Sequence, residues 1–453
     1  MGTLQQNGLS VERREKSLPP GKITEKRKTL GAGFFFLSAF FVIYCIRPED
    51  WIPGLRVIPV AKLTAGGAII ALLAGAGTLQ KKLKALPREA TYLFAMICVL
   101  FLSAILSPVW KGGAVSHTID FAKVLIIYVL IFVVVTDFVR LRRIIYVQSA
   151  SVVGMTAISI VKGHNRPRLD GVIGGIYSNP NDLAFAIVLC IPFCLAFLVT
   201  SKSVLRKCVW AIGILVMLVA LFLTASRAGF IDLLISGLVV LWHFGVRGRR
   251  LYLIVISALL GGVLMVTMGK KLVQRFEAIS AQTEGDSAYG SYQERKELMI
   301  RAVKGIGRYP ILGVGVNNFM SYAGMWHEVH MTYLEIAVEG GIPALVLYLM
   351  FFARGFRNLR FLRKQKNLPP DYDVFAGAMH ASLIGFVVGA LFGPEAYHFF
   401  PYFAVAYTSV MVAMVKDLGN QPTPEPVSNG GRHRTMRAYA ADRKHQPAVT
   451  VSR

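Results

Sequence analysis

The chain has 453 residues, of which 54% are hydrophobic and 17% are charged, and its mean hydropathy is +0.52. A soluble domain is about 45–50% apolar and about 25% charged, so this composition excludes an ordinary soluble fold. In a soluble protein, the net charge of +25 would suggest binding to nucleic acid. Here most of the charge lies in short segments between apolar blocks, where it indicates membrane topology and attraction to anionic lipid.

Apolar blocks recur along the chain, and most have the length of about 17–22 residues that crosses roughly 30 Å of hydrocarbon. The first block runs directly into charged residues without a small-residue cleavage site, which favours an anchor over a removed signal peptide. We therefore expect an all-α integral membrane protein with about twelve transmembrane helices. The expected spans are 30–46, 58–79, 91–107, 118–137, 144–162, 183–200, 208–223, 229–245, 251–268, 331–353, 374–393 and 397–415.

Basic residues predict the orientation of these spans. With the N-terminus inside, 33 of the 50 Lys and Arg residues fall in inner loops and tails, which predicts that both termini are cytoplasmic. The polar tails, 1–29 and 416–453, are expected to be disordered and leave 30–415 as the membrane domain. The segment 269–330, between the ninth and tenth spans, becomes one large extracytoplasmic loop, since long loops translocate whatever their charge.

The loop after the fifth span carries two arginines, Arg166 and Arg168, followed by the run Asn179-Pro180-Asn181. Guanidinium groups bind phosphate oxygens with two parallel hydrogen bonds, so these arginines are candidates for a phosphate site. The Asn-Pro-Asn run is typical of a helix cap. An ordinary solvated loop is the alternative interpretation.

A very short connection between the seventh and eighth spans places Arg227 at the outer surface, beside a helix N-terminus. That end of a helix is already positive, so an arginine there is favourable when an anion binds both. The alternative is an arginine that reaches a lipid phosphate.

The segment 291–308 of the large loop has the pattern of an amphipathic helix. Its expected polar stripe is Glu297, Arg301, Lys304 and Arg308, and its expected apolar stripe is Met299, Val303 and Ile306. Arg295 falls on the apolar side, which indicates a specific partner, whereas Arg301 is expected to be solvated.

Pro310 is expected to end that helix, and a loop containing Asn318 follows. His330 then stands at the start of the tenth span, where an imidazole can accept a proton near neutral pH. A purely structural histidine is the alternative. His327 lies three residues before His330, but no third metal ligand is obvious, and no cofactor is expected.

Together these residues resemble the O-antigen ligase and polymerase family of bacterial envelope membrane proteins. Four stretches in the family's order carry the resemblance, which covers about 160–350: Arg168 with Gly171 and Asn179-Pro180-Asn181; Ser226-Arg227-Ala228-Gly229; Arg295 followed by Pro310 and Gly313-Val314-Gly315; and His330 with Leu334, Glu339 and Gly340. The chain departs from the family at Met331, where Asn is frequent, and at Met299, where Trp is frequent.

The resemblance implies a metal-independent glycan transferase, similar to GT-C-type membrane glycosyltransferases, at the periplasmic face of the bacterial inner membrane. The implied donor is a glycan on a polyprenyl diphosphate, and the acceptor is lipid A–core, a growing chain or a protein. The resemblance carries over diphosphate binding to Arg166, Arg168, Arg227 and Arg295, and catalysis to His330 as a base with Arg227 and Arg295. Supporting roles fall to Asn181, Asn318 and Glu339.

Two other functions stay open. A transporter would explain Asp120, Lys123 and Asp232 inside apolar spans, although the sequence has no repeated halves. A non-catalytic envelope scaffold is the other alternative.

Overall fold

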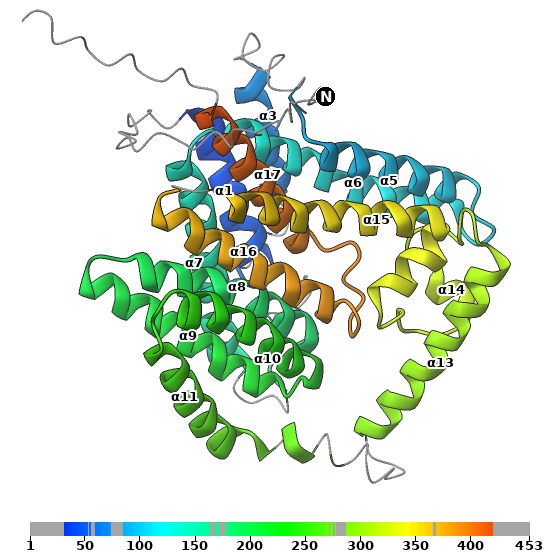
Figure 1. Cartoon of the computed structure of the whole chain (residues 1–453). Coiled ribbons are helices and arrows are strands. Elements are labelled where there is room, and N and C mark those ends of the chain that lie inside the picture. The colour runs from blue at the N-terminus through cyan, green and yellow to red at the C-terminus, as the bar shows by residue number, and fades with distance from the viewer. Residues whose placement is uncertain are drawn as a thin grey trace, which may run out of the picture.

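The computed structural model describes residues 31–52, 54–55, 59–73, 85–163, 168–171, 177, 179–270, 272–274, 277, 287–365 and 368–419. Within these residues the regular structure is helical and contains no strand. Most helices pack side by side in a bundle, and α13 (Ser287–Arg308) and α14 (Phe319–Ala323) lie beside it (Figure 1). The predicted N-terminal tail and nearly all of the predicted C-terminal tail lie outside the described residues.

Each expected span corresponds to a helix. In chain order these are α1 (Ala32–Ile46), α3 (Val60–Leu73), α5 (Arg88–Ile105), α6 (Lys111–Val134), α7 (Phe138–Gly163), α8 (Pro180–Thr200), α9 (Val204–Thr224), α10 (Arg227–Leu241) with the π-helix η2 (Trp242–Arg247), α11 (Tyr252–Met268), α15 (Thr332–Lys364), α16 (Pro370–Gly389) and α17 (Phe400–Gly419). Among the described residues, 8 helices are long and apolar enough to cross a membrane. A multi-pass membrane protein is therefore supported, and the count of twelve crossings stays a prediction.

Basic residues of two predicted inner loops lie at one end of the bundle. At this end, Arg142 at the start of α7 binds Asp371 at the start of α16 with an N–O distance of 2.8 Å, and also donates to Thr200 at the end of α8. Arg247 of η2 lies 3.6 Å from Asp373 of α16. The basic residues of these two predicted inner loops therefore meet at one end, as a consistent membrane topology requires. The opposite end, named the site end, carries the starts of α6, α8, α10, α15 and α17.

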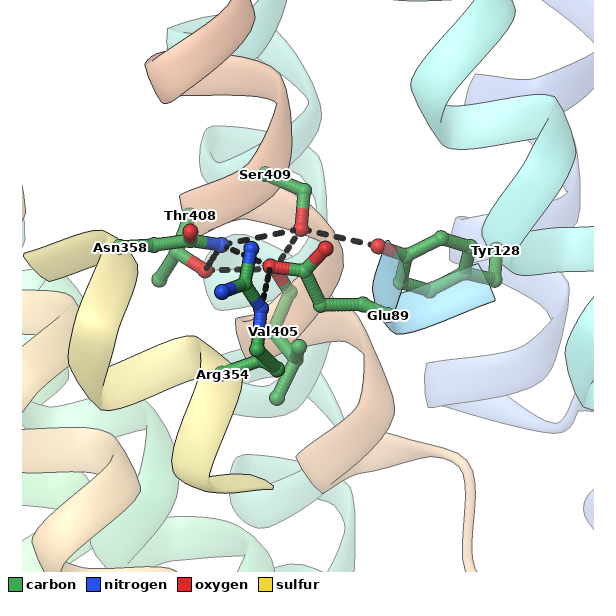
Figure 2. Close-up of polar contacts among 7 residues, drawn as sticks. All are labelled: Glu89, Tyr128, Arg354, Asn358, Val405, Thr408 and Ser409. Atoms are coloured by element: carbon green, nitrogen blue, oxygen red, sulfur yellow. Dashed lines mark hydrogen bonds and ion pairs between the residues drawn. The ribbon is translucent and has the colours of Figure 1, made fainter. Parts of the chain in front are cut away.

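A buried polar cluster joins four helices away from the site end (Figure 2). Glu89 of α5 is 1% exposed, and its Oε1 accepts a 2.7 Å hydrogen bond from Asn358 of α15 and lies 3.5 Å from Arg354 Nε. Asn358 also donates to Ser409 of α17, which accepts a 2.8 Å hydrogen bond from the Tyr128 hydroxyl of α6. Because buried charges are costly unless paired, these contacts specify how α5, α6, α15 and α17 pack.

Helix α15 is broken near its beginning. Gly341 has φ 79° and ψ 173°, a conformation that only glycine adopts readily, and Pro343 follows within the same helix. Pro343 has no N–H, so the Glu339 carbonyl loses its usual helical partner. It instead accepts hydrogen bonds from Gly315 N–H at 2.9 Å and from the Ser103 hydroxyl at 2.7 Å. The loop that follows α13 is thus bonded directly to the break in α15.

Candidate functional site

Arg168 is held where α8, α9 and α10 meet. Its Nε donates a 2.9 Å hydrogen bond to the Thr224 carbonyl oxygen, and its Nη2 lies 3.5 Å from Asn181 Oδ1. The same Asn181 oxygen accepts a 2.7 Å hydrogen bond from the Ser226 hydroxyl. Two of the four sequence motifs therefore form one polar junction, in which Asn181 contacts both Arg168 and Ser226.

The start of α8 has the predicted cap. The Asn179 side chain accepts a 3.0 Å hydrogen bond from the Asn181 N–H, and Pro180 occupies the first helical turn, where its missing N–H costs nothing. The cap fixes the position from which Asn181 reaches Arg168.

Arg227 is the first residue of α10 and is half-buried. Ala225 turns the chain with a left-handed φ of 48°, and the Ser226 hydroxyl caps α10 by accepting a 3.1 Å hydrogen bond from the Gly229 N–H. A Cβ at Gly229 would lie 2.6 Å from the Ala184 Cβ, so the first turn of α10 packs tightly on α8. The cation therefore stands at the positive end of a fixed helix, an arrangement that favours an anion.

Helix α13 buries a face that overlaps only in part with the expected one, since Ile306 packs against the local core as predicted. Leu298 and Ala302 are buried, whereas Val303, which was predicted to lie on the apolar stripe, is 57% exposed. The side chain of Arg301 is 41% exposed and pairs with Glu297 of the predicted polar stripe, and it also donates to the carbonyl oxygen of Ala323 at the end of α14. The buried face differs from the expected one because α14 packs against α13, and the periodicity of α13 alone does not reveal this contact.

Arg295 lies on the buried face of α13, three residues before Leu298, and is half-buried. Burial, with the nearby charges of Arg295 and His327, lowers the pKa of His330 to about 4. His330 is therefore unprotonated at neutral pH and can accept a proton. The structure thus brings together the two residues of the large loop that the sequence singled out.

Asn318 and Glu339, the two other supporting residues, shape the loop above the break in α15. The Asn318 amide donates to the Ser107 hydroxyl at 2.8 Å. The two Glu339 carboxylate oxygens accept hydrogen bonds from Phe319 N–H at 3.3 Å and from the Tyr397 hydroxyl at 2.8 Å. Both side chains are buried and link elements that are distant in sequence.

Loop 390–399, between α16 and α17, adds two titratable residues that the sequence analysis did not assign. Glu395 is 2% exposed, and its carboxylate lies 2.5 Å from His398 Nδ1. Burial lowers the pKa of His398, but the charge of Glu395 and its hydrogen bond outweigh that effect and raise the pKa to about 9. The signal that could have found them is a Glu-x-x-His spacing at the start of the last apolar span, 397–415.

The predicted residues thus fall into two groups at the site end. One group holds Arg168, Asn181 and Arg227, and the other holds Arg295 and His330. Loop 390–399 connects the two groups. Its Glu395 N–H is bonded to Thr332, two residues after His330. At its other side, the charge of Asp182, the neighbour of Asn181, contributes to the raised pKa of His398. Arg166 lies outside the described residues.

Metal ligands do not gather in the part of the chain that the structure describes: it holds no group of three or more His, Cys, Asp or Glu residues able to bind a metal ion. His327 lies 2.6 Å from Glu294 Oε1, and its ring centroid is 6.5 Å from that of His330.

Fold and site together define a multi-pass helical membrane protein with arginines and a neutral histidine at one end of the bundle. Residues 212–349 match the family model described as O-antigen ligase, and this match confirms the family resemblance over that segment. It supports a membrane glycan transferase of the ligase or polymerase type. No curated protein matches the chain.

Proposed function

We propose that the chain is an O-antigen ligase that transfers a glycan from a polyprenyl diphosphate carrier to lipid A–core, at the periplasmic face of the bacterial inner membrane. The observation that carries this proposal is the neutral His330 beside Arg295, at the same end of the bundle as Arg168 and Arg227. The family match over 212–349 supports transfer of a glycan by this end of the protein.

Each group has a distinct task in the proposed reaction. Arg168, Arg227 and Arg295 hold the diphosphate, and Arg166 joins them, because guanidinium groups match phosphate geometry. His330 accepts the proton of the acceptor hydroxyl, whose oxygen attacks the anomeric carbon of the donor. The bond from that carbon to the phosphate oxygen breaks, and polyprenyl diphosphate leaves with the bonding electrons.

The arginines supply positive charge to the leaving diphosphate, so the transfer is proposed to need no metal ion. The test is transfer by purified protein in excess chelator. Transfer at the rate measured without chelator is expected, and loss that one divalent ion restores would contradict the proposed mechanism.

The acceptor distinguishes the variants of this proposal. A polymerase would transfer the glycan to a growing chain, and a protein glycosyltransferase would transfer it to a protein hydroxyl, with the same grip on the donor. The deciding experiment deletes the gene and asks which product disappears. Loss of glycan from lipid A–core supports the ligase, whereas shortened polymer on an intact core supports the polymerase.

One observation favours a transporter as a second candidate. Asp232 of α10 is 1% exposed, and neither of its carboxylate oxygens has a hydrogen-bond partner in the described part of the chain. Buried carboxyls of this kind mark proton or substrate pathways in transporters. By contrast, Asp120 and Lys123 pair with each other on an exposed part of α6. Movement of a lipid-linked glycan across the membrane of liposomes that contain the protein, without its transfer to an acceptor, would favour the transporter.

A further inference from the structure

Loop 390–399 is fixed to α15 at four points, so its side chains have defined positions. The Thr332 hydroxyl donates to the Gly393 carbonyl oxygen at 2.7 Å and accepts from the Glu395 N–H at 2.9 Å. The Thr332 N–H donates to the Ala390 carbonyl oxygen at 2.9 Å, and the Ala396 N–H donates to the buried Glu335 carboxylate at 3.3 Å. The loop is therefore a fixed part of the site end.

Within this loop, Glu395 orients His398. The buried carboxylate accepts a hydrogen bond from His398 Nδ1–H, so Nε2 is the ring nitrogen that remains for a ligand. In the described residues Nε2 has no hydrogen-bond partner, and the side chain of His398 is 30% exposed. A carboxylate that fixes one ring nitrogen and leaves the other accessible is the usual way to aim an imidazole at a ligand.

The surroundings of His398 differ in charge from the arginine groups. Asp182 at the start of α8 and Glu328 in the segment before α15 act on His398 together with Glu395. Burial raises the pKa of Glu328, and His117 of α6 is among the groups whose charge acts on it. Burial raises the pKa of Asp182 to about 8, so this carboxyl is largely protonated at pH 7. A sugar hydroxyl can donate to the Glu395 carboxylate and accept from an imidazolium or from a protonated carboxyl.

We propose that His398 and Glu395 form the acceptor subsite, in which His398 Nε2–H donates to a hydroxyl oxygen of the acceptor sugar and holds that sugar beside His330. This inference rests on the proposed function and adds to it the part of the site that selects the acceptor. The division of labour follows from charge: arginines bind the anionic donor, and the acidic loop binds the hydroxyl-rich acceptor.

The opposite protonation states of the two histidines support this division. His330, with a pKa of about 4, is neutral and suited to take a proton, whereas His398, with a pKa of about 9, is charged and suited only to donate. Two titratable groups whose environments separate their pKa values in this way generally have different tasks in one site.

The test compares wild type with His398→Gln, Glu395→Gln and the double variant, as full chains in lipid nanodiscs. The donor is an undecaprenyl-diphosphate-linked oligosaccharide, and the acceptor is lipid A–core from a ligase-deletion strain. Loss of one charged hydrogen bond predicts a rise of roughly ten- to a hundredfold in the acceptor KM. Donor binding should be unchanged in every variant. That result would also show that each variant is folded.

Two further readouts separate substrate contact from a structural role. If the pair acts as a unit, the double variant should be no worse than His398→Gln. In Glu395→Gln the pKa of His398 should fall below about 9, because the carboxylate that raises it is gone while burial still lowers it, so the acceptor KM should begin to rise at a lower pH than in wild type. In wild type the same rise should begin only near pH 9.

Failure of this inference is distinguishable from failure of the proposed function. An unchanged acceptor KM and pH profile in both single variants, with active wild type, would overturn the acceptor subsite and leave the ligase proposal intact. Weakened donor binding in His398→Gln would assign His398 to the donor and also overturn the inference. Wild-type protein that neither binds the donor nor transfers glycan would instead refute the proposed function.

Discussion

Replacement of Arg295 by Lys tests the donor site most sharply, because it keeps the charge and removes the planar fork. Arg295 is half-buried on the face of α13 that packs against α14 and α15, and its charge acts on His330. A charged hydrogen bond contributes roughly 1.5–3 kcal/mol, so losing one predicts a fall of about ten- to a hundredfold in donor affinity. The pKa of His330 should change little, since the positive charge remains.

The matched control is Arg308→Lys on the same helix. Arg308 is exposed, and its guanidinium lies over the ring of its neighbour Tyr309 at 5.5 Å from the centroid. The assay is equilibrium binding of an undecaprenyl-diphosphate-linked oligosaccharide to protein in nanodiscs, followed by the rate of transfer. Equal loss in both variants would refute a specific contact and show that the helix acts through bulk positive charge.

Three further predictions follow from the site and the fold. His330→Ala should lower kcat by about 100- to 10,000-fold with donor affinity retained, and wild-type kcat should fall on the acid side only near pH 4, where the base becomes protonated; wild-type turnover of the variant would remove His330 from the mechanism. Gly341→Ala should lower the free energy of unfolding by at least roughly 1–2 kcal/mol, because φ is 79° and a Cβ would meet a backbone oxygen at 2.2 Å. Gly154→Ala, where a Cβ meets nothing within 4 Å, is its control in a thermal unfolding series, and equal melting temperatures would contradict the strain argument. A cysteine at Asn181 should react with an impermeant thiol reagent in spheroplasts and one at Arg249 should not, and the reverse pattern would invert the proposed topology.

Hydropathy predicted the helices well because lipid offers no hydrogen-bond partners. The backbone N–H and C=O groups of each apolar block must therefore bond to one another, as they do in a helix. Hydropathy predicted boundaries less well. α6 begins at Lys111, seven residues before the expected span, and α15 continues to Lys364, beyond the expected end at 353. Polar first turns and amphipathic last turns carry little apolar signal, so a hydropathy window does not include them.

The candidate site was predictable where residue type alone is informative. Arg295 could be singled out because a guanidinium on the apolar face of a helix is costly without a specific partner. His330 could be singled out because it is a titratable residue at the start of a predicted span. The bonds between the loop at Gly315 and the broken helix at Glu339 were not predictable, because they join backbone groups that no side-chain pattern marks. Glu395 and His398 were missed for a related reason: their meaning depends on Thr332 and Asp182, which are distant in sequence.

The ion pair between Glu89 and Arg354 also constrains how the protein is made. Arg354 directly follows the expected span 331–353 and is largely buried in the bundle, so placing its guanidinium there is costly without Glu89, which lies on α5 near the other end of the chain. When α15 leaves the ribosome, α5 and α6 have already been made and can present Glu89 and Tyr128, whereas Thr408 and Ser409 of α17 follow later (Figure 2). Efficient insertion of α15 therefore requires that the N-terminal helices stay close to the insertion machinery until the last third of the chain arrives. Expression of the C-terminal half alone should yield poorly inserted protein, and co-expression of the N-terminal half should rescue it.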